Sequence, residues 1–133
     1  MNRLYKNNGS VLLVVVFAAA MLSAITIGIL HLTSEELQLM NNHIGSVGAL
    51  AAAEAGLNDS FARIRQGSDP NIAGESYSGG SYTVAAVQNS NFSYTVTSTG
   101  ISSLGFVAKV EADITTGNNS PYVIRIDNLR INE

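Results

Sequence analysis

The stretch that decides the fold is Ser10–Leu30, SVLLVVVFAAAMLSAITIGIL, which contains no charged side chain. A helix rises about 1.5 Å per residue, so this stretch as a helix spans roughly 31 Å, the thickness of the hydrocarbon core of a bilayer. Arg3 and Lys6 precede it, and the acidic pair Glu35–Glu36 follows it. Because basic residues stay on the cytoplasmic side, we predict a membrane-spanning helix with a cytoplasmic amino terminus and an exported remainder.

Three interpretations of this apolar stretch are open. A cleaved secretory signal has a basic start, but its apolar core usually runs for about 7 to 15 residues, whereas apolar residues here continue past Ala18–Ala20. An ordinary single-pass anchor fits the length but gives no reason for a polar leader, residues 1–9, that closes with Gly9. In the third interpretation a peptidase removes residues 1–9 at the cytoplasmic face and leaves Ser10 as the free amino terminus.

The composition limits the classes of function. The chain has 133 residues and a net charge of −3, so it has room for one small domain after the helix and offers no basic patch for nucleic acid. It contains no cysteine, which excludes disulfides and cysteine-metal chemistry. The second half is rich in Ser, Thr, Asn, Gly and β-branched residues, a composition typical of an exported β domain.

Residues 31–66 are predicted to form an amphipathic helix that continues the anchor of residues 10–30, because apolar residues recur at spacings of three, four or seven. These are Leu37, Met40, Ile44, Val47, Leu50, Leu57, Phe61 and Ile64. No proline interrupts the segment, which favours one continuous helix. Thr33 with Glu36 matches a capping box, so a fresh helix start at Thr33 is an open alternative.

Small residues in this helix leave little side-chain bulk, and we expect another helix to approach closely there. The candidate interface positions are Gly45, Gly48, Glu54 and Gly56. Glu54 has no basic residue three or four positions away, so a solvated carboxylate is its default interpretation and a contact with a partner is the alternative.

Residues 67–80 are predicted to be a connecting loop, since Gly67–Pro70 ends the helix and little apolar periodicity follows. Four strands are predicted in residues 81–133. The alternation is cleanest in the third, where Phe106–Ile114 places apolar residues on one face and charged residues on the other. In the last strand the apolar phase switches, which predicts a bulge near Asp127 and Asn128 or a strand break.

Four strands cannot bury an apolar face unaided, so a cover is needed. The second half of the helix, near Leu57, Phe61 and Ile64, is the expected cover. The predicted fold class is α+β: a long N-terminal hydrophobic-to-amphipathic helix packed on a small antiparallel β-sheet head.

These features together resemble type IV pilin-like proteins: the leader ending in Gly9, the junction Gly9–Ser10, the uncharged helix, the AAEAGL stretch Ala52–Leu57 and a small β head. The chain is most similar to the PilX-type minor pilins and the minor pseudopilins, whose amino-terminal segments often carry such a stretch. The resemblance covers the first 66 residues well and the remainder only in style. It implies the pilin-like arrangement of helix and head.

The resemblance also implies a processing step and a packing role. A prepilin peptidase is expected to cleave between Gly9 and Ser10 and to methylate the amino terminus of Ser10. The helix is then expected to reside in the membrane before assembly and to pack afterwards with other such helices in a filament core. The expected core-packing residues are Val14, Phe17, Leu22, Ile25 and Ile29.

Val14 stands where most members of the wider family have a glutamate, at the fifth mature position. That glutamate compensates a neighbour's terminal amine in a dry core, where an uncompensated charge is costly. No other acidic residue precedes Glu35. We therefore expect a minor subunit that primes, caps or modulates assembly of a type IV pilus-like or secretion filament.

The resemblance implies several partners and two locations. The expected partners are other pilin or pseudopilin subunits through their N-terminal helices, the prepilin peptidase, an inner-membrane assembly platform and, before assembly, membrane lipid. The expected location is the inner membrane with the head outside, and then a cell-surface or periplasmic filament. Motility, DNA uptake, adhesion and secretion all stay open, because these systems share the amino-terminal helix.

The sequence contains no catalytic pattern that would indicate an enzyme, and no cofactor is expected. His31 and His43 lie about 120° apart around a helix, so they do not form a metal pair. Oxygen ligands for calcium are available in or near loops at Asp69, Glu75, Asp113 and Asn118. Their spacing does not resemble an EF-hand, so no metal is expected and calcium is the alternative.

The runner-up function is a single-pass membrane-anchored exported β domain with a ligand- or partner-binding role, and a secreted signal-bearing domain comes third. Tyr77, Tyr82 and Tyr122 would mark a binding face in the runner-up. In a sheet this small they are instead expected to pack along its edge.

Overall fold

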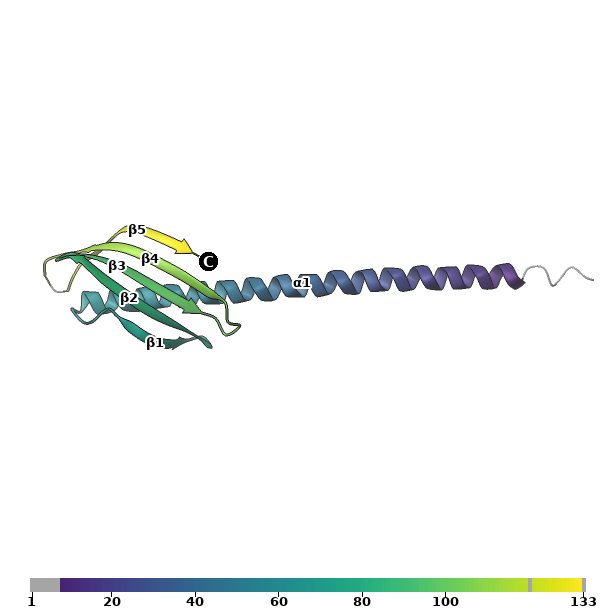
Figure 1. Cartoon of the computed structure of the whole chain (residues 1–133), viewed down its shortest axis with the longest axis horizontal. Coiled ribbons are helices and arrows are strands. Elements are labelled where there is room, and N and C mark those ends of the chain that lie inside the picture. Colours follow the sequence, from purple (N-terminus) through teal and green to yellow (C-terminus); the bar gives the residue numbers. More distant parts are fainter. Residues whose placement is uncertain (1–7, 120, 133) are drawn as a thin grey trace, which may run out of the picture. The chain divides into compact units, whose positions relative to one another are not determined.

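The computed structural model describes residues 8–119 and 121–132. One helix, α1, precedes five strands (Figure 1). Their bounds are α1 Asn8–Arg65, β1 Ile72–Tyr77, β2 Gly80–Ser90, β3 Ser93–Ile101, β4 Val107–Thr116 and β5 Ile124–Asn132. The strands form one antiparallel sheet, so the predicted α+β class is confirmed. The chain comprises two compact units, Met1–Asn41 and Asn42–Glu133, and the second is called the head.

In the first unit, residues 10–30 of α1 carry no charged side chain, and their polar side chains are those of Ser10, Ser23 and Thr26. Ser23, Thr26 and Thr33 each donate a hydrogen bond from the side-chain hydroxyl to the carbonyl oxygen four residues earlier, at 2.8 to 3.0 Å. These hydroxyls therefore have a partner without water, as an apolar environment demands. Thr33 lies inside α1, so the alternative of a fresh helix start there is wrong and the helix is continuous.

Strand β1 lies within residues 67–80, so the prediction of a connecting loop is wrong for Ile72–Tyr77 and the sheet has five strands rather than four. Only Ile72 in β1 is buried, and the strand exists because its backbone pairs with β2. Ser78 (φ 46°) and Gly79 (φ 81°) join the two strands. Positive φ at both central positions is the property of the tight I′ hairpin turn.

The five strands follow one another across the sheet in chain order, as a meander (Figure 1). The alternation predicted for β4 is confirmed, since Ala108, Val110, Ala112 and Ile114 are buried and Lys109 between them is exposed. The inner face, which carries these buried residues, faces the helix.

The bulge predicted near Asp127 is also confirmed. Asp113 pairs with Asn128 and the next residue, Ile114, pairs with Ile126, so Asp127 is the extra residue of β5. A bulge shifts the alternation by one residue. As a result, the apolar residues on both sides of Asp127 share the inner face of the sheet, opposite the buried residues of β4.

The core of the head lies between the sheet and residues 42–65 of α1. The buried apolar residues of the helix are Ala49, Ala52, Ala53, Leu57 and Ile64, and the sheet contributes Ile72, Tyr82, Val84, Val96, Ala108, Val110, Ala112 and Ile114. The predicted cover is confirmed, with Leu57 and Ile64 buried and Phe61 partly buried against the same cluster.

Helix and sheet approach most closely at Gly100 in β3. A Cβ atom at this position would lie 2.2 Å from the carbonyl oxygen of Ala49 and 2.3 Å from the backbone nitrogen of Ala53. No side chain larger than hydrogen fits there. The small residues of α1 thus allow its backbone to rest directly on β3.

Candidate functional site

The first candidate surface is the apolar segment of α1, residues 10–30, which has no protein partner in the described structure. The expected core-packing residues all lie on it and are more than half exposed: Val14 63%, Phe17 63%, Leu22 65%, Ile25 56% and Ile29 59%. The window that qualifies as a membrane span has none of its surface buried. By length and composition this segment is a candidate membrane anchor.

The predicted cleavage site lies at the start of α1, where the helix begins at Asn8 and continues through Gly9 and Ser10. Residues 1–7 of the predicted leader are outside the described residues. Ser10 is exposed, in keeping with its neighbours along the apolar segment.

The small-residue positions of α1 serve the head itself, which corrects the expectation of a second helix at Gly45 and Gly56. A Cβ at Gly45 would lie 2.2 Å from the ring of Phe106, and a Cβ at Gly56 would lie 2.4 Å from Oγ of Ser98. Both glycines are buried. Gly45 is covered by the β3–β4 connection of the same chain, and Gly56 is covered by strands β2 and β3. The small residues in the sequence predicted that another element can approach closely at these positions, but they did not show which element does so.

Gly48 and Glu54 lie differently. A Cβ at Gly48 would make only ordinary contact, 3.4 Å from Cβ of Ser102, and Glu54 is exposed to solvent. Glu54 therefore has the solvated position that was its default interpretation. Of the four candidate interface positions, Glu54 is exposed and Gly48 is partly exposed, whereas Gly45 and Gly56 are buried.

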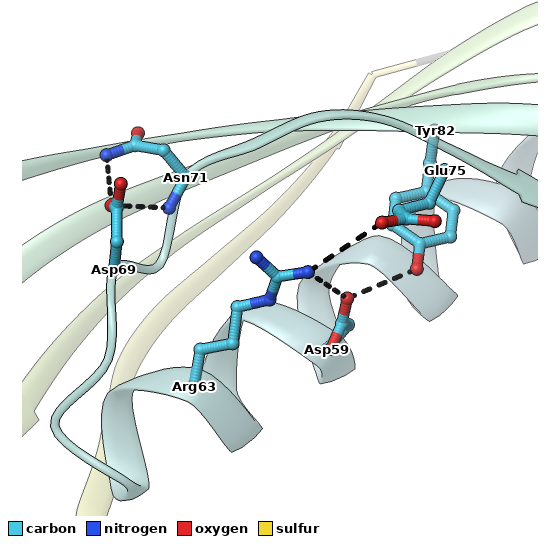
Figure 2. A network of polar contacts seen from close by, with 6 residues as sticks. All are labelled: Asp59, Arg63, Asp69, Asn71, Glu75 and Tyr82. Carbon is cyan, nitrogen blue, oxygen red and sulfur yellow. Dashed lines mark hydrogen bonds and ion pairs between the residues drawn. The ribbon is translucent and has the colours of Figure 1, made fainter.

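A polar cluster joins α1 to the β1 and β2 side of the sheet (Figure 2). Nη2 of Arg63 lies 3.4 Å from Oδ2 of Asp59 and 3.9 Å from Oε1 of Glu75, and the hydroxyl of Tyr82 donates a 3.3 Å hydrogen bond to Asp59. Burial, with the nearby Asp59 carboxylate second, raises the pKa of Tyr82 above its ordinary value. These contacts connect α1 to β1 and β2, and the raised pKa keeps the Tyr82 side chain neutral, so we interpret the role of the cluster as structural.

A second polar contact holds the start of β1. Oδ1 of Asp69 accepts hydrogen bonds from the backbone N–H of Asn71 at 3.0 Å and from its side-chain amide at 2.8 Å (Figure 2). The backbone bond, then the side-chain bond, lowers the pKa of Asp69. The side-chain oxygen of Asn71 in turn accepts from the backbone N–H of Ala86 in β2, at 2.9 Å. Asp69 and Asn71 therefore anchor the polar strand that sequence analysis missed.

The described part of the chain contains no cluster of side chains suited to bind a metal ion. Within residues 8–119 and 121–132, no group of three or more His, Cys, Asp or Glu side chains could hold a metal ion. His31 instead pairs with Glu35 one turn further along α1, at 3.2 Å between Nδ1 and Oε1.

The second candidate surface is the inner face of β5, formed by Ile124, Ile126, Leu129 and Ile131 and called the β5 face. Three of these side chains are about half exposed: Ile126 52%, Leu129 50% and Ile131 49%. Their partners across the ladder in β4 are at most 1% exposed. The helix therefore covers the inner face as far as β4 and leaves β5 uncovered.

A groove runs between the β5 face and α1. It has a volume of about 500 Å³ and is lined on the helix by Asn58, Phe61, Ala62 and Arg65. Its sheet side includes Val123, which is 76% exposed, together with Ile124 and Ile126. Contiguous exposed apolar surface of this kind marks an interaction site more often than scattered apolar residues do.

The outer face of β5 is charged, in contrast to its inner face. Nη2 of Arg130 lies 2.7 Å from Glu111 and 2.8 Å from Asp113 of β4, and Nε of Arg125 lies 2.7 Å from Asp127. A hydrogen bond from Thr115, followed by the bond from Arg125, lowers the pKa of Asp127. The phase switch in the sequence was the available signal that one face of β5 is apolar and the other wet.

Comparison of the chain with protein-family models, with curated proteins and with solved structures finds no match. The candidate site is therefore assigned from the chain's own residues: the apolar segment of α1 and the β5 face.

Proposed function

We propose that this chain is a minor pilin or pseudopilin, a structural subunit that primes, caps or modulates assembly of a type IV pilus-like or secretion filament. The observation that supports this most is that one helix, α1, contains both an uncharged membrane-length segment and the core helix of a β head. No proline or loop separates the two segments.

The apolar segment supports the proposal because it needs cover that the chain does not supply. Side chains such as Leu13, 70% exposed, and Leu30, 65% exposed, are unfavourable in water. Lipid covers them in an inserted subunit, and neighbouring helices cover them in a filament core. The same segment is long enough for the first environment and free of charged side chains for the second.

Val14 supports a minor role rather than a bulk one. A repeated subunit would bury many terminal amines in the filament core, each requiring a compensating carboxylate. This chain has no acidic residue between Ser10 and Ser34. This requirement does not apply to a subunit that is present once or a few times per filament and has no subunit of its kind above it.

The β5 face is the proposed contact of the head with a neighbouring pilin-like subunit. It carries no charge, so a partner meets no desolvation cost for ionised groups there. Covering its half-exposed side chains would complete the burial that α1 achieves over the other strands. The proposed sequence of locations is the inner membrane first and an extracytoplasmic filament afterwards.

Mass spectrometry of the mature chain tests the proposed processing. The expected product begins at a methylated Ser10, and replacement of Gly9 by valine is expected to abolish that product. Gly28→Val is the matched control, because Gly28 lies in the same helix as Gly9 and a Cβ at Gly28 would meet nothing within 4 Å. A mature chain that retains Met1, or that begins after residue 20, would refute the proposal.

The retained Met1 is the result expected of the alternative function, a single-pass anchored exported β domain. The Arg3, Lys6 and Glu35–Glu36 flanks of the apolar segment support that alternative equally. Counting this chain against the most abundant pilin in sheared filaments separates a minor from a bulk subunit. Equimolar incorporation would overturn the minor role while leaving the pilin-like assignment in place.

A further inference from the structure

A cavity of about 220 Å³ opens at the end of the head where α1 terminates. It lies between the end of α1, the turn joining β2 to β3, and three residues at and after the end of β4: Thr116, Asn118 and Tyr122. Backbone hydrogen bonds hold these three segments together: Tyr122 N–H donates to Arg65 at 3.2 Å and Thr116 N–H donates to Phe92 at 2.7 Å. Ile64, 5% exposed, and Thr116, 8% exposed, are its buried walls. The cavity is therefore a built feature of the head and does not belong to the β5 face.

The lining combines aromatic rings with polar side chains and has no charge. The rings are Phe92, Tyr94 and Tyr122, and the polar side chains include Ser68, Asn91 and Asn118. No Asp, Glu, Lys, Arg or His is part of the lining. Ser68, Asn91 and Asn118 are exposed to solvent, and Tyr94 and Tyr122 are partly buried. Donors and acceptors that a ligand can reach thus accompany the aromatic rings of the lining.

We propose that this cavity binds one neutral sugar ring of a glycan. A pyranose ring presents C–H groups on its faces, which pack on aromatic side chains, and hydroxyls around its rim, which bond to amides and phenols. The neutral lining gives no counterion for a charged ligand, whose desolvation would be uncompensated. A volume of about 220 Å³ lies below the roughly 300–1,000 Å³ of pockets for drug-sized ligands, so a single ring is the fitting unit.

A proline ring, the other common ligand of aromatic grooves, matches the cavity less well. Proline has no N–H donor and offers one carbonyl acceptor, so it would leave most of the polar groups of the lining without a partner. Buried polar groups that lose water without gaining a partner reduce affinity. The number of amide, hydroxyl and phenol groups in the lining favours a ligand with several hydroxyls.

Saturation-transfer NMR on the full-length chain tests the proposal. The chain is held in lipid nanodiscs rather than in a glycoside detergent, which would compete for the cavity. The probes are the methyl glycosides of glucose, galactose and N-acetylglucosamine at about 10 mM, tenfold above a Kd of about 1 mM, the order expected for a single ring. At least one glycoside is expected to receive saturation. Absence of transfer to all three would overturn the proposal.

Variants locate the binding. Phe92→Ala and Asn118→Ala are expected to weaken binding by about fivefold or more, and Tyr122→Phe, which removes only a hydroxyl and keeps the fold, is expected to weaken it measurably. Tyr77→Ala is the matched control, since Tyr77 is an exposed aromatic outside the cavity. Glycoside binding that is unchanged in all three cavity variants would overturn the assignment, as would displacement of the glycoside by a proline-rich peptide. Because the assay uses the isolated chain, its outcome is independent of whether the chain enters a filament.

Discussion

Replacing Gly100 by alanine adds a methyl group at a position where the backbones of α1 and β3 are in close contact. The added Cβ would lie 2.2 Å from the carbonyl oxygen of Ala49, 2.3 Å from the nitrogen of Ala53 and 3.0 Å from the carbonyl carbon of Ala52. All three are backbone atoms of one helix, so none can rotate away. Either the helix lifts off β3 or the strand distorts.

The expected cost follows from these contacts. Overpacking a core typically costs 1–3 kcal/mol, and a clash with rigid backbone on one side places Gly100→Ala at about 3 kcal/mol. Gly56→Ala meets movable side chains, Oγ of Ser98 at 2.4 Å and the ring of Tyr82 at 2.6 Å, and is expected to cost about 1–2 kcal/mol. Gly48→Ala is the control: its Cβ makes ordinary contact, and its higher helix propensity stabilises by up to about 1 kcal/mol.

Urea denaturation of the full chain in micelles measures these differences. The tyrosine signal in near-UV circular dichroism reports on the head, because the chain has five tyrosines and no tryptophan and all but Tyr5 lie in the head. With a slope of about 1–3 kcal/mol per molar urea, the midpoint of Gly100→Ala is expected about 1–3 M below wild type. A midpoint at or above wild type, or an equal loss in Gly48→Ala, would refute the close-packing argument.

Three further outcomes are expected. Ser98→Ala should raise the unfolding free energy by about 1 kcal/mol, because the Ser98 hydroxyl is buried without a hydrogen-bond partner among the described residues; a lower urea midpoint would contradict this. Because the pKa of Tyr82 is raised in the folded state, the neutral phenol stabilises the fold below pH 10, and this contribution is lost as pH rises through the folded pKa. The stability of the wild type should therefore fall more steeply above pH 10 than that of Tyr82→Phe. Parallel pH profiles of the two proteins would argue against burial as the cause. Ile131→Lys on the β5 face should change head stability by less than about 1 kcal/mol but reduce incorporation into filaments, which sheared-filament immunoblots measure; normal incorporation would remove the β5 face as a subunit contact.

Local patterns in the sequence predicted α1, the strand β4 and the bulge at Asp127. A long run without charge or proline makes helix the structure that satisfies its own backbone in an apolar environment. Strict alternation in β4 reflects one buried and one wet face, which is a property of the strand itself. The phase switch beside Asp127 likewise lies within a few residues, so it was readable without the fold.

Strand β1 was not readable in this way. Apart from Ile72 its side chains are exposed. Asn71, held by Asp69, anchors the strand by accepting a hydrogen bond from Ala86 of β2. Such a segment has no apolar period because it buries almost nothing. Its structure depends on the edge of β2 being available for pairing.

The sequence by itself determined that this chain has a membrane-length apolar helix, a helical continuation with a small-residue stripe, and a β head with alternating strands. Only the tertiary structure decided what the stripe contacts and which face stays open. Gly45 and Gly56 meet the chain's own sheet side, while the β5 face has apolar side chains and no cover. The physical reason is that periodicity records which side of an element avoids water, whereas the identity of the covering partner depends on distances between segments far apart in the chain.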